Sequence, residues 1–183
     1  MVEQGQLFIA VDPAYGETGT VGMVGVRNNK IAFTRAHQFM YSTMSFKSIK
    51  GQWTSGPPGW YSGMICATAL AWGGYETPVV VMEVPHMSGK TAVSSAGIIK
   101  VIGAVESRIR GWGWGWVEVT APAAKKALSG YGKAEKADMV DAAIKWCGQS
   151  LPFSNTVAEN SALADACGIA LAGIKKWENK QDE

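Results

Sequence analysis

Cysteine and histidine are both scarce in this sequence. The three cysteines are Cys66, Cys147 and Cys167, none of them in a CxxC pair, and there are only two histidines. An odd number of unpaired cysteines excludes neither fold nor activity, but it argues against a disulfide framework and against a structural zinc site. We therefore expect a reducing compartment, with Cys147 and Cys167 acting as core thiols.

Long apolar runs are also missing. The opening MVEQGQLFIAVDP lacks the basic region and long apolar stretch of a secretory signal. No run of about 18 apolar residues follows, so no membrane span or membrane partner is expected. We expect a cytoplasmic protein, and a nucleoid, phage-infected cell or organelle matrix stays open as the setting.

Charge of one sign is not in excess either. The net charge is +2, with 17% charged and 47% hydrophobic residues. This is a globular composition, and 183 residues suit one domain spanning residues 1–183. A nucleic-acid partner is neither required nor excluded, because a local basic patch can suffice where the net charge is small.

The order of apolar runs and turn formers predicts an α/β fold. Strands are expected over residues 6–12, 20–26 and 30–39, with Asn28-Asn29 as a hairpin turn between the last two. A helix over 60–74, opened by Pro57-Pro58, precedes a β-branched strand over 78–84. A helix over 91–110, a strand over 114–119 and helices near 121–128, 134–148 and 161–177 complete the chain. This order predicts a mixed five-stranded sheet, three antiparallel strands followed by parallel ones, flanked by helices.

Three carboxylates stand out by their position. Asp12 ends the first expected strand, Glu83 lies near the end of VVVME, and Asp165 lies among alanines in the last helix. If the first two strands are parallel neighbours, both side chains reach one rim of the sheet, where α/β proteins place their sites. Carboxylates gathered there would repel one another unless a divalent cation is bound. Taken singly, each has an ordinary reading: a turn starter, a solvated strand end and a polar helix stripe.

Lysines surround a glycine loop between two expected helices. The segment APAAKKALSGYGKAEKADMV holds Lys125, Lys126, Lys133 and Lys136 around Gly130-Tyr131-Gly132. Such a loop can contact phosphates, and Lys136 could offset charge on a reacting phosphate. A solvated helix–turn–helix with ordinary surface lysines explains the same pattern.

These motifs together resemble the RuvC-type Holliday junction resolvases of the ribonuclease H superfamily, including those of phage type. IAVDPAYGETG resembles the first family motif, with Ala14 where glycine is usual. The segment that begins VVVMEVP resembles the second, the lysine loop resembles the catalytic loop, and ADACGIALA resembles the last. In this order they span residues 7 to 172, nearly the whole chain.

The resemblance implies a ribonuclease H-like fold, a homodimer and metal-dependent cleavage of branched DNA such as four-way junctions. It implies that Asp12, Glu83 and Asp165 hold two Mg²⁺ ions per site, for which Mn²⁺ could substitute. It also implies that Lys136 is a catalytic-loop residue and that Lys125 contacts DNA, with Lys126 and Lys133 beside it. The helix over 91–110 would help to form the dimer.

One position departs from the family pattern. The family usually has a second aspartate three residues before the last one, and this chain has Ala162 there. Ser161 is a poor metal ligand. If the last helix begins at Ser161, Glu159 or Asn160 could turn into the site, and we favour Glu159 as the fourth ligand.

Other features leave alternatives open. Trp112, Trp114 and Trp116 alternate with glycine, so they could form a base-stacking platform or fill space against helices. Trp53, Trp60 and Tyr61 could enter a junction or pack a loop, and His86 could assist protonation or be an ordinary surface residue. The competing functions are a nuclease for flaps, forks or RNA, and a non-catalytic junction-binding protein, which Ala162 favours. A sugar-kinase-like ATPase needs two ribonuclease H-like halves, and this chain is too short for both.

Overall fold

The computed structural model describes residues 5–13, 18–40, 57–73, 76–85, 92–148 and 156–181. The strands are β1 (Leu7–Asp12), β2 (Thr18–Arg27), β3 (Lys30–Met40), β4 (Val79–Val84) and β5 (Gly115–Thr120). The helices are α1 (Pro57–Gly73), α2 (Ala92–Gly111), α3 (Ala121–Ser129), α4 (Lys136–Cys147) and α5 (Val157–Gln181).

The five strands form one mixed sheet in the order β3-β2-β1-β4-β5. β1 is central: it pairs antiparallel with β2 and parallel with β4, and β4 pairs parallel with β5. Asn28 and Asn29 have φ values of 51° and 56°, the left-handed conformation that a tight two-residue hairpin turn requires. The predicted mixed sheet and the hairpin are both confirmed.

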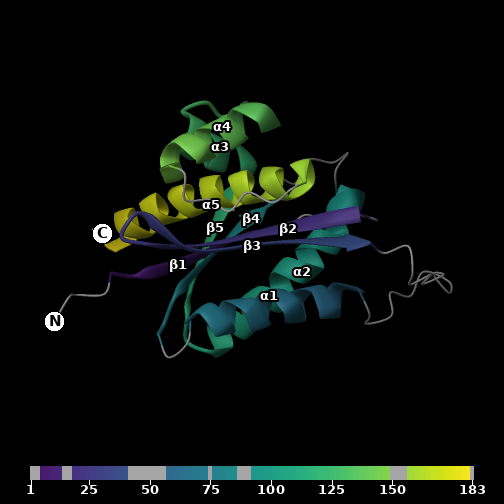
Figure 1. Cartoon of the computed structure of the whole chain (residues 1–183). Coiled ribbons are helices and arrows are strands. Elements are labelled where there is room, and N and C mark those ends of the chain that lie inside the picture. Colours follow the sequence, from purple (N-terminus) through teal and green to yellow (C-terminus); the bar gives the residue numbers. More distant parts are fainter. Residues whose placement is uncertain are drawn as a thin grey trace.

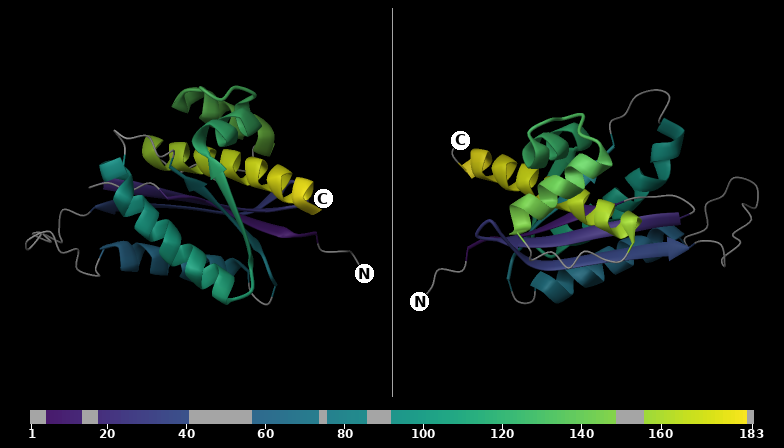
Figure 2. Two further views of the ribbon diagram at one scale, coloured as in Figure 1. Left: turned by 180° about the vertical axis from the view of Figure 1, so that it is seen from behind. Right: turned by 45° about the horizontal axis from the view of Figure 1, so that its top comes forward.

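Helices cover both faces of the sheet, as Figures 1 and 2 show: α1 and α2 lie on one face, and α3, α4 and α5 on the other. The strands alternate between two cores. Along β4, Val79 and Val81 belong to the core under α5, whereas Val80 and Met82 belong to the core of α1 and α2. This is the two-residue period of a strand that is buried on both sides.

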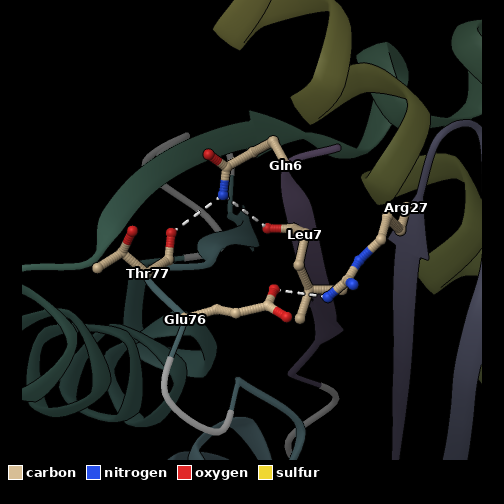
Figure 3. A network of polar contacts seen from close by, with 5 residues as sticks. All are labelled: Gln6, Leu7, Arg27, Glu76 and Thr77. Atoms are coloured by element: carbon tan, nitrogen blue, oxygen red, sulfur yellow. Dashed lines mark hydrogen bonds and ion pairs between the residues drawn. The ribbon is translucent and has the colours of Figure 1, made fainter. Parts of the chain in front are cut away.

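Polar contacts between the segments that precede β1 and β4 stabilise the end of the sheet where β1 begins (Figure 3). Gln6 Nε2 donates to the carbonyl oxygen of Thr77 at 3.0 Å and to that of Leu7 at 3.2 Å. Arg27, opposite Leu7 in the sheet, forms an ion pair with Glu76. These contacts hold β1 and β4 in register at the end farthest from Asp12 and Glu83.

Helix α5 is the one described helix whose length and hydropathy would fit a membrane span. Most of its apolar stretch is buried inside the fold, against the central strands and α3, and its residues from Ser161 to Ala164 are all buried. Burial of this kind is what the core helix of an α/β fold requires. We therefore assign α5 to the protein core.

Two glycines let α5 approach its neighbours closely. A Cβ on Gly22 of β2 would lie 2.1 Å from the backbone oxygen of Ala162, and a Cβ on Gly168 would lie 2.7 Å from that of Ala124 in α3. Both separations are too short for any side chain, so the backbones themselves are in contact. Gly22 sets the height of α5 above the sheet, and Gly168 sets the position of α3 against α5.

The predicted boundaries differ from the structure mainly at α1 and α5. The helix predicted over 60–74 begins at Pro57, because proline is well suited to the first turn. The last helix, predicted over 161–177, runs from Val157 to Gln181. Its start was misplaced because Thr156, whose Oγ1 accepts the Glu159 N–H at 3.3 Å, is the residue that caps it.

Substitution of Gly22 tests this packing. We expect Gly22→Ala to lower the free energy of unfolding by about 1–3 kcal/mol, because the added methyl group would displace the backbone of α5. Gly103→Ala in α2 is the control, since a Cβ there meets nothing within 4 Å and alanine favours a helix by about 0.5–1 kcal/mol. Urea denaturation measures both variants, and equal stability of the two would contradict the close contact between α5 and β2.

Candidate metal-dependent site at the carboxyl end of the central strands

Asp12 and Glu83 lie side by side on the face of the sheet that α5 covers. Val11 pairs with Met82 in the parallel register, so the next residues of the two strands are Asp12 and Glu83. Alternation gives both side chains the direction of Ala10 and Val81, whose side chains lie in the α5 core. Both carboxylates are therefore at the carboxyl end of neighbouring parallel strands, where α/β sheets place ligands.

Asp165 reaches the same place from α5. It is half-buried in an otherwise buried stretch of the helix, one turn after the contact of Ala162 with Gly22, which itself pairs with Asp12. The charges of Asp165 and Glu83 both act on Asp12, and the charge of Asp165 acts on Glu83. The structure thus brings together the three carboxylates singled out in the sequence.

The environment of these groups favours their protonated forms. Loss of solvent, then the charges of Asp165 and Glu83, raise the pKa of Asp12 well above its usual value, and Lys136 opposes them. Loss of solvent and the charge of Asp165 raise the pKa of Glu83 to about 7. Burial also raises the pKa of Asp165, against the opposing charges of Lys125 and Lys136. The cluster carries more negative charge than its surroundings stabilise.

Lys125 and Lys136 are the cations that face this cluster. Lys125 acts on Glu83 and Asp165, and Lys136 acts on Asp12 and Asp165. Lys125 Nζ also donates to the carbonyl oxygen of Ala134 at 2.7 Å. Because this bond joins α3 to the segment before α4, it fixes the loop that presents Lys136.

The loop between α3 and α4 is locally determined. Gly130 ends α3 in the left-handed conformation at φ 82°, and its N–H donates to the carbonyl oxygen of Lys126. Glu135 and Asp138 form a reciprocal capping box at the start of α4. The Glu135 N–H donates to Asp138 Oδ2 at 3.0 Å. Lys136 therefore occupies the first turn of α4, next to the cluster.

The two other predicted DNA-contacting lysines lie elsewhere. Lys133 is exposed in the loop between α3 and α4. Lys126 lines a groove of about 730 Å³ between β5, α3 and α5, which we name the β5 groove. The same groove is lined by Lys175 and Lys176 near the end of α5. Sequence reasoning missed these two residues, although an adjacent lysine pair on the last helix was the available signal.

Ala162, at the position where the family usually has a second aspartate, is closed off from solvent. Ala162 is 5% exposed and lies against Gly22, and Ser161 is 7% exposed. The hypothesis that Glu159 turns into the site required a helix start at Ser161, and that start is wrong, since α5 begins at Val157. Glu159 is six residues before Asp165, which places the two side chains about 120° apart around the helix.

The donor atoms of this cluster are suited to a divalent cation, although they do not form a complete coordination shell. Within the described residues, no three acidic, histidine or cysteine side chains form a complete metal-binding group. The donors gathered from Asp12, Glu83 and Asp165 are all carboxylate oxygens, which Mg²⁺ and Mn²⁺ accept. Desolvation raises the pKa values of these groups, and a bound cation would favour their ionised forms.

The three alternating tryptophans lie in different surroundings in the structure. Trp114 and Trp116 are buried, at 9% and 7% exposure, and fill the core of α1 and α2. Trp112 is 39% exposed and packs edge-on against Trp114, with ring centroids 5.1 Å apart. All three precede or begin β5, at the end of the sheet opposite the carboxylates. Trp114 and Trp116 therefore fill space against helices, one of the two alternatives that the sequence left open, and Trp112 precedes β5, which begins at Gly115.

Other sequence features are resolved only in part. Cys167 is buried and the half-buried Cys147 packs against the same core, as predicted. Trp53 and His86 lie outside the described residues, and nothing is described of the side chains of Trp60 and Tyr61. Their predicted roles stay predictions.

The sheet order and the placement of helices define a ribonuclease H-like α/β fold. The structure of Thermus thermophilus RuvC matches with a TM-score of 0.62 at 18% identity, covering 96% of this chain and 97% of that one. T. thermophilus RuvC in complex with a Holliday junction substrate matches with a TM-score of 0.63 at 18% identity, covering 94% and 96%. The predicted resemblance to RuvC is confirmed at the level of the fold.

Sequence comparison adds nothing to this structural likeness. No protein-family model matches the chain, and no curated protein sequence matches it.

The carboxylate cluster predicts how stability depends on pH without metal. Because the folded-state pKa of Glu83 is about 7, above its ordinary 4.5, the unfolded chain loses this proton first as pH rises. Stability should therefore fall between about pH 4.5 and pH 7, by at most about 3 kcal/mol before screening by solvent. Asp12 and Asp165 act in the same direction. Thermal unfolding in chelator at several pH values measures the effect.

Glu83→Gln should flatten this pH dependence, since the amide does not ionise. The control is Glu178→Gln, an exposed glutamate of α5. Mg²⁺ should raise the melting temperature of the unsubstituted protein most at the higher pH values, where the carboxylates are free to bind it. Parallel pH profiles for the unsubstituted protein and Glu83→Gln would show that Glu83 is not part of the carboxylate cluster.

Proposed function

We propose that this chain is a metal-dependent endonuclease that cleaves phosphodiesters in branched DNA. The observation that carries the proposal is the meeting of Asp12, Glu83 and Asp165 at one rim of the sheet, with Lys125 and Lys136 facing them. Acidic oxygens beside cations are suited to a phosphodiester that is attacked while it gains negative charge. The fold match over nearly the whole chain supports a single nuclease domain over residues 1–183.

In this proposal Asp12, Glu83 and Asp165 hold two Mg²⁺ ions, or Mn²⁺ in their place. When bound, the ions supply Lewis-acid stabilisation of the attacking and leaving oxygens. Glu159 would have to reach the site from the third residue of α5, so we propose three carboxylates as the principal ligands and Glu159 as an auxiliary one.

The lysines would act on the substrate. Water attacks the phosphorus, the bond to the 3′ oxygen breaks, and the products carry a 5′ phosphate and a 3′ hydroxyl. Lys136 stabilises the charge that develops on the phosphate, because it already faces Asp12 and Asp165. Lys125 is fixed by its bond to Ala134 and positions the DNA backbone, with Lys126 and Lys133 as further phosphate contacts.

A four-way junction is the proposed substrate, because T. thermophilus RuvC has been determined with a Holliday junction and shares this fold. A homodimer would present two sites to two strands, matching the two-fold symmetry of the junction. Within this proposal the protein acts in the cytoplasm. Flaps, forks and structured RNA are the alternative targets for the same site.

A second candidate function is junction binding without cleavage. The specific observation in its favour is Ala162, which leaves the usual place of a fourth carboxylate closed against Gly22. Metal-dependent cleavage separates the two candidates, because a binding protein would hold the junction without producing nicks.

The proposal predicts the loss of cleavage in Asp12→Asn. We expect at least a hundred-fold loss of rate on a labelled four-way junction in Mg²⁺, in line with removal of a group that stabilises the transition state. Asp141→Asn, an exposed aspartate of α4, is the control and should cleave like the unsubstituted protein. Paired nicks near the crossover that vanish with chelator support the nuclease. Tight binding without nicks in either Mg²⁺ or Mn²⁺ would support the binding protein instead.

A further inference from the structure

The β5 groove begins beside the candidate site and leads away from it. Val84, the residue after Glu83, and Thr120, its partner in the register of β4 and β5, line the end nearest the site. Asn179 lines the far end, near the end of α5. A molecule that leaves the carboxylate rim along α5 would therefore enter this groove.

The polar lining of the groove is dominated by positive charge. Its polar and charged residues are Glu118, Thr120, Lys126, Lys175, Lys176 and Asn179. Lys176 Nζ donates to the backbone oxygen of Glu118 at 2.8 Å, so this amine is held against the edge strand. The carboxylate of Glu118 accepts the indole N–H of Trp116 at 3.3 Å, on the side of the core of α1 and α2.

The length of the groove suits a polyanion more than a single phosphate. Along α5 the groove is lined from Leu171 to Asn179, a rise of about 12 Å, which corresponds to about three to four base pairs of duplex DNA. Lys126 lies on one wall, in α3, and Lys175 and Lys176 lie on the other, in α5. Cations on both walls can contact successive phosphates of one strand.

We propose that the β5 groove binds the backbone of a DNA arm that extends from the carboxylate site, with Lys175 and Lys176 as its phosphate contacts. This inference rests on the proposed function, and it extends the DNA surface from the loop between α3 and α4 to the edge of the sheet. Lys126 then belongs to this groove, on the outer side of α3, while Lys125 faces the carboxylates. The groove sets the direction in which the arm leaves the site.

The test is DNA binding by Lys175→Gln/Lys176→Gln, which removes two charges and keeps polar side chains. The matched control is Lys30→Gln/Lys145→Gln, two lysines that line a separate cavity near the β2–β3 turn, at the opposite edge of the sheet from β5. Fluorescence anisotropy with a labelled four-way junction and a labelled linear duplex is measured in chelator, over a series of salt concentrations.

We expect the groove variant to bind the junction on the order of ten-fold more weakly, with a salt slope lower by about two, as loss of two phosphate contacts requires. The control variant should keep the affinity and salt slope of the unsubstituted protein. Weakened binding in the groove variant supports the inference even if no variant cleaves DNA, an outcome that would overturn only the nuclease proposal.

Equal affinities and slopes for all three proteins, with cleavage intact, would overturn the groove and leave the proposed function standing. The occupant of the groove would then be sought among protein segments that pair with the edge of β5. Failure of the unsubstituted protein to bind either DNA would overturn both proposals.

Discussion

The close contact of α5 with the sheet and with α3 is the constraint on which the site depends. Gly22 allows the backbone at Ala162 to rest on β2, and Gly168 allows α3 to rest on α5. The first contact delivers Asp165 to the strand ends of Asp12 and Glu83. The second brings Lys125 to the same carboxylates. A larger residue at either glycine would separate the groups whose charges must act together.

The carboxylate cluster of Asp12, Glu83 and Asp165 lowers the stability of the folded chain, and the rest of the fold offsets this cost. Desolvation raises the pKa values of all three carboxyl groups, and repulsion by neighbouring carboxylates adds to it for Asp12 and Glu83. The two facing lysines offset only part of this. A buried group of like charges costs stability unless it has a partner. The cores on both faces of the sheet must outweigh this cost, and a costly group of this kind is typical of functional sites.

Much of the fold could be predicted from local pattern. The β-branched run before Glu83, the Asn28-Asn29 turn and the Pro57-Pro58 helix start are short-range signals, and the structure contains the strand, the hairpin and the helix that they predict. The three carboxylates could be predicted because two end apolar strands and one interrupts an apolar helix. The placement of Lys126 could not be predicted from local pattern. Lys125 faces the site and Lys126 faces the β5 groove, and only the packing of α3 on α5 decides which of the two adjacent lysines faces which.

The start of α5 could not be predicted for a similar reason. The sequence around Ser161 offers several places for a helix to begin, and the cap at Thr156 competes with them. The actual start, four residues earlier at Val157, places the side chains of Glu159 and Asp165 about 120° apart around the helix. Trp112 differs from Trp114 and Trp116 in its exposure because it precedes β5, which begins at Gly115. Helix and strand boundaries depend on caps and on neighbours, and these are weakly encoded in a single stretch of sequence.

The central position of β1 has a consequence for the order in which the carboxylate cluster forms during folding. Its antiparallel partner follows it directly in the chain, but its parallel partner β4 comes only after β2, β3 and α1. Closure of such a long loop is slow compared with hairpin formation. Asp12 and Glu83 become neighbours only when that late pairing is complete, and Asp165 joins them when the final helix docks. A nascent or half-folded chain would therefore lack the assembled carboxylate cluster, because the topology brings the three groups together only when the whole domain has folded.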